Sequence, residues 1–117
     1  MSNVEAQPDP EALSSMTATT PDKTGAPTTV TSEPGRFTIS VDGRTVGFAE
    51  FSDRTGRRTF FHTEVDPAFQ GRGLASIVVK AALDATRDAG LRIVAPCSMV
   101  ADYLAKSGAY AELVDPA

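Results

Sequence analysis

The pattern of apolar and polar residues first becomes regular after residue 36. Apolar and polar residues alternate over residues 37–41, which is the period of a strand with one buried face. Asp42-Gly43 is a strong signal for a two-residue hairpin turn, because both central residues of such a turn need positive φ. Residues 44–51 are expected to return as a second strand, and residues 57–65 to form a third. The pattern therefore predicts an antiparallel three-strand meander.

The period then changes from that of a strand to that of a helix. Apolar residues follow helical spacing over residues 74–85, and Gly90 is expected to end this helix. The short apolar run 91–95 follows a helix, so we expect it to form a parallel strand through a right-handed crossover. Ser98 is a suitable N-cap for a last helix over residues 99–106. The order β-β-β-α-β-α predicts an α+β (mixed α/β) fold, in which a meander is followed by a helix, a parallel strand and a helix.

The composition divides the chain into two parts. Residues 1–34 are rich in Pro, Ser, Thr and Ala, contain no aromatic residue and carry the whole net charge of −4. Their few apolar side chains cannot offset the entropy lost on ordering, so we expect a disordered acidic tail. Residues 35–117 balance ten acidic with ten basic residues and are expected to form one compact domain.

The composition also excludes several classes of protein. The tail lacks the basic and apolar regions of a signal peptide, and no stretch approaches the ~18 apolar residues of a membrane span. Cys97 is the only cysteine, which excludes an internal disulfide and a multi-cysteine metal site. Because the body is not basic, we expect no nucleic-acid partner. A cytoplasmic protein without a metal or a membrane partner is the resulting expectation.

The turn between the third strand and the long helix holds the main candidate chemistry. It reads Gln70-Gly71-Arg72-Gly73-Leu74-Ala75. The first N–H groups of a helix have no intrahelical acceptor and that end is partly positive, so the turn predicts a phosphate site. The two glycines would let the backbone approach a ligand closely; alternatively, they only permit a tight turn. A dinucleotide fingerprint would need a third glycine where Ser76 stands, and a P-loop ending is absent.

The pattern Gln70-x-x-Gly73-x-Ala75 at this turn resembles the acetyl-CoA pyrophosphate motif of the GCN5-related N-acetyltransferases (GNAT superfamily). The body is similar to a compact single-domain subgroup that lacks the helices between the first two strands. The resembling features are His-Thr-Glu-Val at 62–65, the glycine turn, Cys97 after the last strand and Gly-Ala-Tyr at 108–110. The resemblance covers about residues 36–115.

This resemblance implies acetyl-CoA as the co-substrate. The backbone N–H groups of residues 71–75 would receive the pyrophosphate, and Arg72 would add a side-chain charge. The pantetheine would lie between strands 60–65 and 91–95. The residues implied in binding acetyl-CoA are Val65, Gln70, Gly71, Arg72, Gly73, Leu74 and Ala75.

Acetyl transfer requires a neutral amine, and deprotonating a lysine-like amine with a pKa of ~10.4 at pH 7 costs roughly 4–5 kcal/mol. A positioned base lowers that barrier. Family members often place a carboxylate on the third strand, which makes Glu64 the candidate base. His62 lies on the same strand face and could orient or replace it. Alternatively, both are polar residues on a solvated strand face.

The leaving thiolate must also be protonated, and the resemblance suggests two residues. Many relatives use a tyrosine of the last helix, where Tyr103 stands; it lies five residues before Gly108, whereas four is the usual spacing. Cys97 is expected at the start of the same helix, where a thiol is more readily deprotonated and could serve as nucleophile or acid. Alternatively, Cys97 is an inert, buried small residue.

The leading hypothesis is therefore an N-acetyltransferase that moves an acetyl group from acetyl-CoA to an amine acceptor, either a small molecule such as a polyamine or a protein or peptide amine. A non-catalytic (acetyl-)CoA-binding sensor or partner module is the alternative, because little of the chain is left to build an acceptor pocket. A third hypothesis is an interaction domain that uses the acidic tail. The sequence indicates no oligomeric state.

Overall fold

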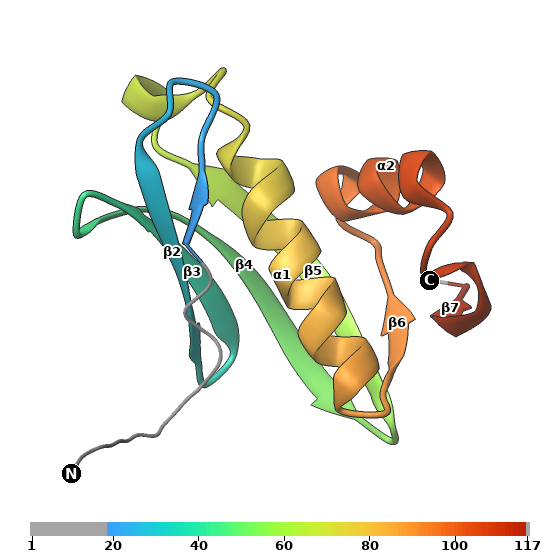
Figure 1. The fold of residues 1–117 in the computed structure, drawn as a ribbon. Coiled ribbons are helices and arrows are strands. Elements are labelled where there is room, and N and C mark those ends of the chain that lie inside the picture. Colours follow the sequence, from blue (N-terminus) through green and yellow to red (C-terminus); the bar gives the residue numbers. More distant parts are fainter. Residues whose placement is uncertain (1–18, 117) are drawn as a thin grey trace, which may run out of the picture.

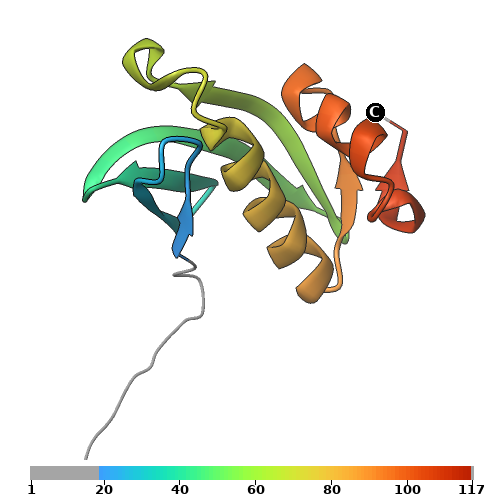
Figure 2. The same ribbon diagram turned by 45° about the horizontal axis from the view of Figure 1, so that its top comes forward.

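The structure is a computed structural model that describes residues 19–116. Seven strands form one sheet in the order β1-β2-β3-β4-β5-β6-β7, and two helices pack on it (Figure 1). Helix α1 (Leu74–Asp88) crosses one face of the sheet, and helix α2 (Ser98–Ser107) lies beside α1. The sheet curls around α1, and the opposite sheet face is covered by no element of the described chain (Figure 2). This arrangement confirms the predicted α+β fold.

Five antiparallel strands form the first part of the sheet. They are β1 (Thr19–Pro21), β2 (Pro27–Glu33), β3 (Arg36–Val41), β4 (Arg44–Arg54) and β5 (Arg57–Val65). The predicted three-strand meander is confirmed as β3–β5, with a two-residue turn of positive φ at Asp42-Gly43. Strand β4 is longer than expected, so only Thr55 and Gly56, both of positive φ, form the turn to β5.

The two N-terminal strands correct the predicted tail. β2 pairs with β3 of the meander and β1 pairs with β2, although the sequence predicted disorder through residue 34. Thr28 and Val30 are buried on the core face of β2, and Val30 lies opposite Ile39 of β3. The reason is that threonine is β-branched and favours strands, and that an existing edge supplies the partner for pairing. The predicted disorder of residues 1–18 concerns a part of the chain that lies outside the described residues.

The core lies between α1 and the sheet. Three aromatic rings line its sheet side, with centroid distances of 5.3 Å between Phe37 and Phe51 and 6.0 Å between Phe51 and Phe60. The face of α1 that meets them is buried through Leu74, Val78, Val79, Ala82, Leu83 and Thr86. As predicted, Gly90 follows the end of α1 with a positive φ of 75°. This packing fixes where α1 begins, and so where the glycine turn lies.

The C-terminal part adds two parallel strands. β6 (Arg92–Val94) pairs with the first three residues of β5, and β7 (Val114–Asp115) pairs with β6 after a 3-10 helix at Ala111–Leu113. The prediction that Ser98 caps the last helix was wrong, because Cys97 occupies the cap position. The Cys97 N–H donates to the Phe60 carbonyl oxygen (3.2 Å), which keeps Cys97 extended so that Ser98 is already helical.

A β-bulge in β5 decides which side chains face the core. Phe51 of β4 pairs with Phe60, but Glu50 pairs with His62, so Phe61 is one extra residue in β5. The bulge reverses the alternation of side chains. Phe60 is buried before the bulge and Thr63 after it, whereas His62 is exposed on the opposite face.

The contact between β4 and the end of β5 leaves no room for a side chain at Gly47. A Cβ on Gly47 would lie 2.8 Å from the Glu64 carbonyl oxygen and 3.2 Å from Val65 Cγ2. We expect Gly47→Ala to lower the free energy of unfolding by about 1–3 kcal/mol, because the neighbouring strand must move. Thermal unfolding measures the effect, and Ser52→Ala, at an exposed position of the same strand, is the control. An unchanged melting temperature for Gly47→Ala would contradict this packing.

Candidate active site at the glycine turn

The glycine turn leads directly into α1. Asp66 caps a short 3-10 helix (Pro67–Phe69) by accepting from the Ala68 N–H at 2.9 Å. Gly73 is the N-cap of α1 and adopts the left-handed region, with φ 80°. The first intrahelical bond runs from the Ile77 N–H to the Gly73 carbonyl oxygen (3.2 Å), so the N–H groups of residues 74–76 precede it. The cap has no side-chain hydrogen bond, and the first turn has no acidic residue, which leaves this helix end suited to an anion.

The residues predicted to bind acetyl-CoA surround one cavity of about 250 Å³. Six of the seven line it, namely Val65, Gln70, Gly71, Gly73, Leu74 and Ala75. A second cavity of about 190 Å³ lies between α1 and α2 and shares Ala75, Ser76 and Met99 with the first. Together the two cavities form a cleft that runs from the glycine turn to the space between the helices.

Arg72 is the seventh residue, and its side chain has a partner within the protein. Its Nε and Nη2 atoms each lie 2.8 Å from Asp22 Oδ2, and Nη2 also donates to Thr24 Oγ1 at 3.2 Å. The guanidinium carbon lies 4.9 Å from the centroid of the Phe69 ring. The role of Arg72 toward phosphate stays a prediction, but its charge is balanced by a carboxylate 50 residues away in the sequence.

Asp22 is fully buried and joins the turn between β1 and β2 to the glycine turn. Its Oδ1 atom accepts from the Thr24 N–H (2.8 Å), the Thr24 hydroxyl (2.6 Å) and the Ala26 N–H (3.1 Å). These hydrogen bonds, with those from Arg72, outweigh the effect of burial and lower the pKa of Asp22 to about 2. The Lys23 N–H donates to the Arg72 carbonyl oxygen at 2.9 Å, which makes the connection a backbone one as well.

Strands β5 and β6 separate next to this cleft. Their pairing ends at Thr59 and Val94, and the hydrogen bond from the Cys97 N–H to Phe60 follows. The Cys97 Sγ atom lies 3.6 Å from the Thr63 hydroxyl oxygen. The second half of β5 therefore lacks a β6 partner, as the resemblance implied for strands 60–65 and 91–95.

His62 and Glu64 lie together on the open sheet face. His62 Nε2 is 3.0 Å from Glu64 Oε1, and about half or more of each side chain is exposed, 50% and 62%. The His62 ring lies 5.7 Å from the Phe48 ring, centroid to centroid. The pair is thus preformed and in contact with solvent, as a base for an incoming acceptor would need to be.

The structure does not bring all four predicted catalytic residues together. Thr63 is buried next to Cys97, whereas its neighbours His62 and Glu64 are exposed, so the pair and the thiol lie on opposite sheet faces. The stretch of β5 that has no β6 partner lies between them. Tyr103 lies on the helix side and lines the cleft between α1 and α2.

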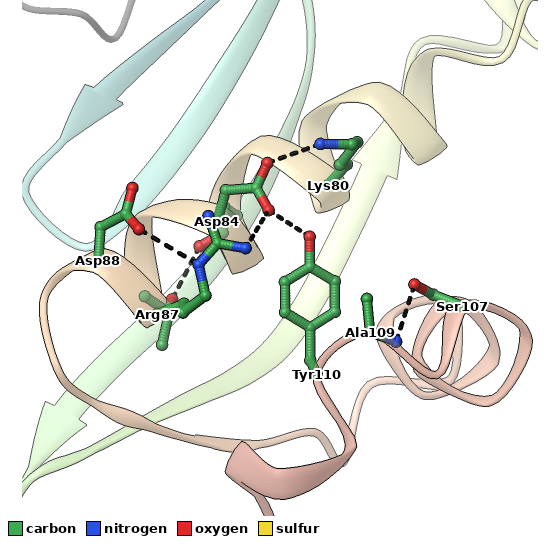
Figure 3. A network of polar contacts seen from close by, with 9 residues as sticks. Lys80, Asp84, Arg87, Asp88, Ser107, Ala109 and Tyr110 are labelled. Atoms are coloured by element: carbon green, nitrogen blue, oxygen red, sulfur yellow. Dashed lines mark hydrogen bonds and ion pairs between the residues drawn. The ribbon is translucent and has the colours of Figure 1, made fainter.

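Tyr110 is a buried residue to which the sequence assigned no role. Its hydroxyl donates to Asp84, which also forms ion pairs with Lys80 (2.7 Å) and Arg87 (3.5 Å) on α1 (Figure 3). Burial and the Asp84 carboxylate both raise the pKa of Tyr110 well above its usual value. Because this hydroxyl is held as a neutral donor, Tyr110 fixes the C-terminal segment to α1 and is unsuited to giving up a proton.

Two further features concern the described residues alone. Within residues 19–116, no three His, Cys, Asp or Glu side chains lie close enough together to hold a metal ion. In the same part of the chain, neither helix is long and apolar enough to cross a membrane.

A mixed sheet whose parallel strands separate beside a glycine turn at a helix N-terminus has the fold of acyl-CoA N-acyltransferases. The family model for the GCN5-related N-acetyltransferases matches residues 36–113, which are 78 of the 117 residues. The chain belongs to this family, whose members are acyltransferases.

Two solved structures show the same fold. A GCN5-like protein from Staphylococcus aureus, determined by NMR, is 20% identical with a TM-score of 0.60, and the match covers 75% of this chain and 88% of the other. The ribosomal-protein-S18-alanine N-acetyltransferase from Escherichia coli is 20% identical with a TM-score of 0.54, covering 62% of this chain and 50% of the other. No curated protein matches the sequence significantly.

The sequence did not identify every residue of the site. Lys23 and Asp22 were assigned to the tail, although Asp22-Lys23-Thr24-Gly25 has the composition of a turn, which was the available signal. Met99, 43% exposed, lines both cavities and has no signal in the sequence.

The lowered pKa of Asp22 predicts a pH-dependent stability. A carboxyl whose pKa falls from 3.8 to about 2 on folding stabilises the protein above pH 4, and that contribution is lost as the pH falls through 2. We expect Asp22→Asn to be less stable at pH 7 and to lose less stability between pH 4 and pH 2. Denaturant unfolding at several pH values measures this difference. Asp102→Asn, at an exposed carboxyl on α2, is the control and should follow the wild type.

Proposed function

We propose that this protein is an acetyl-CoA-dependent N-acetyltransferase that transfers the acetyl group to an amine. The observation that carries the proposal is the uncapped N-terminus of α1 beside a cavity lined by six of the seven expected acetyl-CoA residues. Family membership supports the same chemistry.

In this proposal the pyrophosphate of CoA binds at the first turn of α1. Three backbone N–H groups, those of residues 74–76, precede the first helical hydrogen bond and face an end of the helix without acidic side chains. Hydrogen bonds to a charged acceptor contribute about 1.5–3 kcal/mol each, so a few of them would anchor the ligand. The pantetheine would follow the cleft past Met99 to the gap between β5 and β6.

The proposed chemistry is attack of the amine nitrogen on the thioester carbonyl carbon, followed by cleavage of the carbon–sulfur bond. Glu64 accepts the proton of the attacking amine, and His62, 3.0 Å away, orients the carboxylate. Both side chains lie on the open sheet face, which is where an acceptor can approach.

The leaving thiolate of CoA takes up a proton on the other side of the gap. Cys97 is our first candidate for the donor, because it lies at the point where β5 and β6 separate. Tyr103 is the second candidate, from its position in the cleft between the helices.

An open sheet face does not enclose the acceptor, so it suits an extended one, such as a peptide amine or a small polyamine. The same openness favours a second candidate function, an (acetyl-)CoA-binding module without turnover. No element of the described chain covers the open sheet face, on which His62 and Glu64 are exposed, so little of the described chain is left to hold an acceptor (Figure 2).

The proposal requires that acetyl-CoA stabilise the protein. A ligand at 100 times its Kd adds about 2.7 kcal/mol, which raises the melting temperature of a small domain by several degrees. We expect this shift with acetyl-CoA and CoA, but not with ATP or NAD at the same concentration. Gly73→Val should abolish the shift, because a side chain at this left-handed position would block the turn. A wild-type protein unmoved by acetyl-CoA would contradict the proposal.

Turnover separates the enzyme from the binding module. We expect Glu64→Gln to lower kcat by about 10²–10⁴-fold with unchanged affinity for acetyl-CoA, because the base acts only in the chemical step. Chromatography measures the rate of CoA release, with a lysine-containing peptide or spermidine as the acceptor. Glu50→Gln removes a carboxylate from the adjacent strand and is the control. We expect Cys97→Ala to lower kcat as well.

Binding of acetyl-CoA without release of CoA in the presence of either acceptor would favour the module. Full activity of both Glu64→Gln and Cys97→Ala would show that the acid and base are other residues.

A further inference from the structure

The turn between β1 and β2 contributes a lysine side chain to the glycine turn. The Cγ and Cε atoms of Lys23 both lie 3.4 Å from the position that a Cβ would take on Gly73. The ammonium nitrogen is bonded to Cε, so the charge lies next to the start of α1. Lys23 is the only basic residue among residues 1–34, and it lies outside the segment that matches the family model.

The position of Lys23 is fixed by its neighbours. The Lys23 N–H is bound to the Arg72 carbonyl oxygen, and the buried Asp22 is bound to the Arg72 side chain. The Asp22 carboxylate also holds the turn closed through Thr24 and Ala26. These contacts attach the backbone at residue 23 to the glycine turn, and the lysine stem lies along Gly73 as a result.

The charges around the turn leave Lys23 as an uncompensated cation. Asp22 balances Arg72, and Asp66 is engaged in capping the 3-10 helix. Among residues 19–116, no carboxylate forms an ion pair with the Lys23 ammonium group. Arg44, whose guanidinium carbon lies 5.6 Å from the Phe69 ring centroid, is another cation near the turn. Because Asp22 neutralises Arg72, the positive side-chain charge available to an anion at this turn comes from Lys23 and Arg44.

We propose that Lys23 binds the pyrophosphate of CoA and that the N-terminal hairpin is part of the CoA site. This inference rests on the proposed function, and it adds a ligand contact from a segment outside the matched family domain. A lysine ammonium is a compact point charge that binds phosphate without a fixed geometry. It would act together with the N–H groups and the partial positive charge at the start of α1.

The test compares the affinity of the full chain for CoA with and without the lysine charge. We expect Lys23→Gln to raise the Kd for CoA about tenfold, the loss typical of one charge-assisted hydrogen bond. Lys23→Arg should restore most of the affinity because it keeps the charge. Arg54→Gln removes one exposed positive charge at the opposite end of β4 and should leave the Kd unchanged. Calorimetric titration at low salt measures each Kd, and thermal unfolding without ligand checks that each variant is folded.

A second ligand identifies the phosphate that is bound. Lys23→Gln should raise the Kd by the same factor for CoA and for 3′-dephospho-CoA, because both ligands contain the pyrophosphate. A loss of affinity for CoA but not for 3′-dephospho-CoA would overturn the assignment, since it would place the lysine at the 3′-phosphate.

The outcomes separate this inference from the proposed function. If the wild type binds CoA and Lys23→Gln binds it equally well, the inference is wrong and the proposed function stands. If the wild type does not bind CoA, both are wrong.

Discussion

The separation of β5 from β6 is the constraint on which the site depends. β6 pairs with only three residues of β5, and the chain then leaves the sheet through Cys97 to begin α2. After this pairing, the Cys97 N–H donates one further backbone hydrogen bond to the Phe60 carbonyl oxygen of β5. Two features of the candidate site lie beyond that point, namely a stretch of β5 without a β6 partner and a cleft between the two helices.

The electrostatics of the site depend on a contact between distant parts of the chain. Asp22 and Arg72 are both charged, and the Asp22 side chain is fully buried, yet both of its carboxylate oxygens accept hydrogen bonds, with Arg72 among the donors. Such a pair adds little net charge, so it acts mainly to hold two turns together. The β1–β2 hairpin is thereby attached to the glycine turn, although its composition resembles that of a linker.

The sequence predicted the central elements well, because their signals are local. The alternation in β3, the turn at Asp42-Gly43 and the helical spacing of α1 each require only neighbouring residues. The glycine turn was found for the same reason: two glycines between a strand and a helix are informative by themselves. Six of the residues it suggested do line one cavity.

The remaining features could not be predicted because they depend on tertiary contacts. The sequence of β2 does not show that the edge of β3 is available for pairing, and threonine-rich segments also occur in linkers. The partner of Arg72 lies 50 residues away, so its side chain could be assigned to a ligand as easily as to Asp22. The residue 61 bulge has no signature either, since each residue around it favours a strand.

That bulge gives β5 one residue more than its alternating pattern needs. Many side chains could replace Phe61, which is 51% exposed, without disturbing the core. Deleting this position would return the strand to simple alternation, with Thr63 still facing the core and Glu64 still facing solvent. The bulge can therefore absorb a change of one residue in the length of β5 without exchanging the two faces of the site.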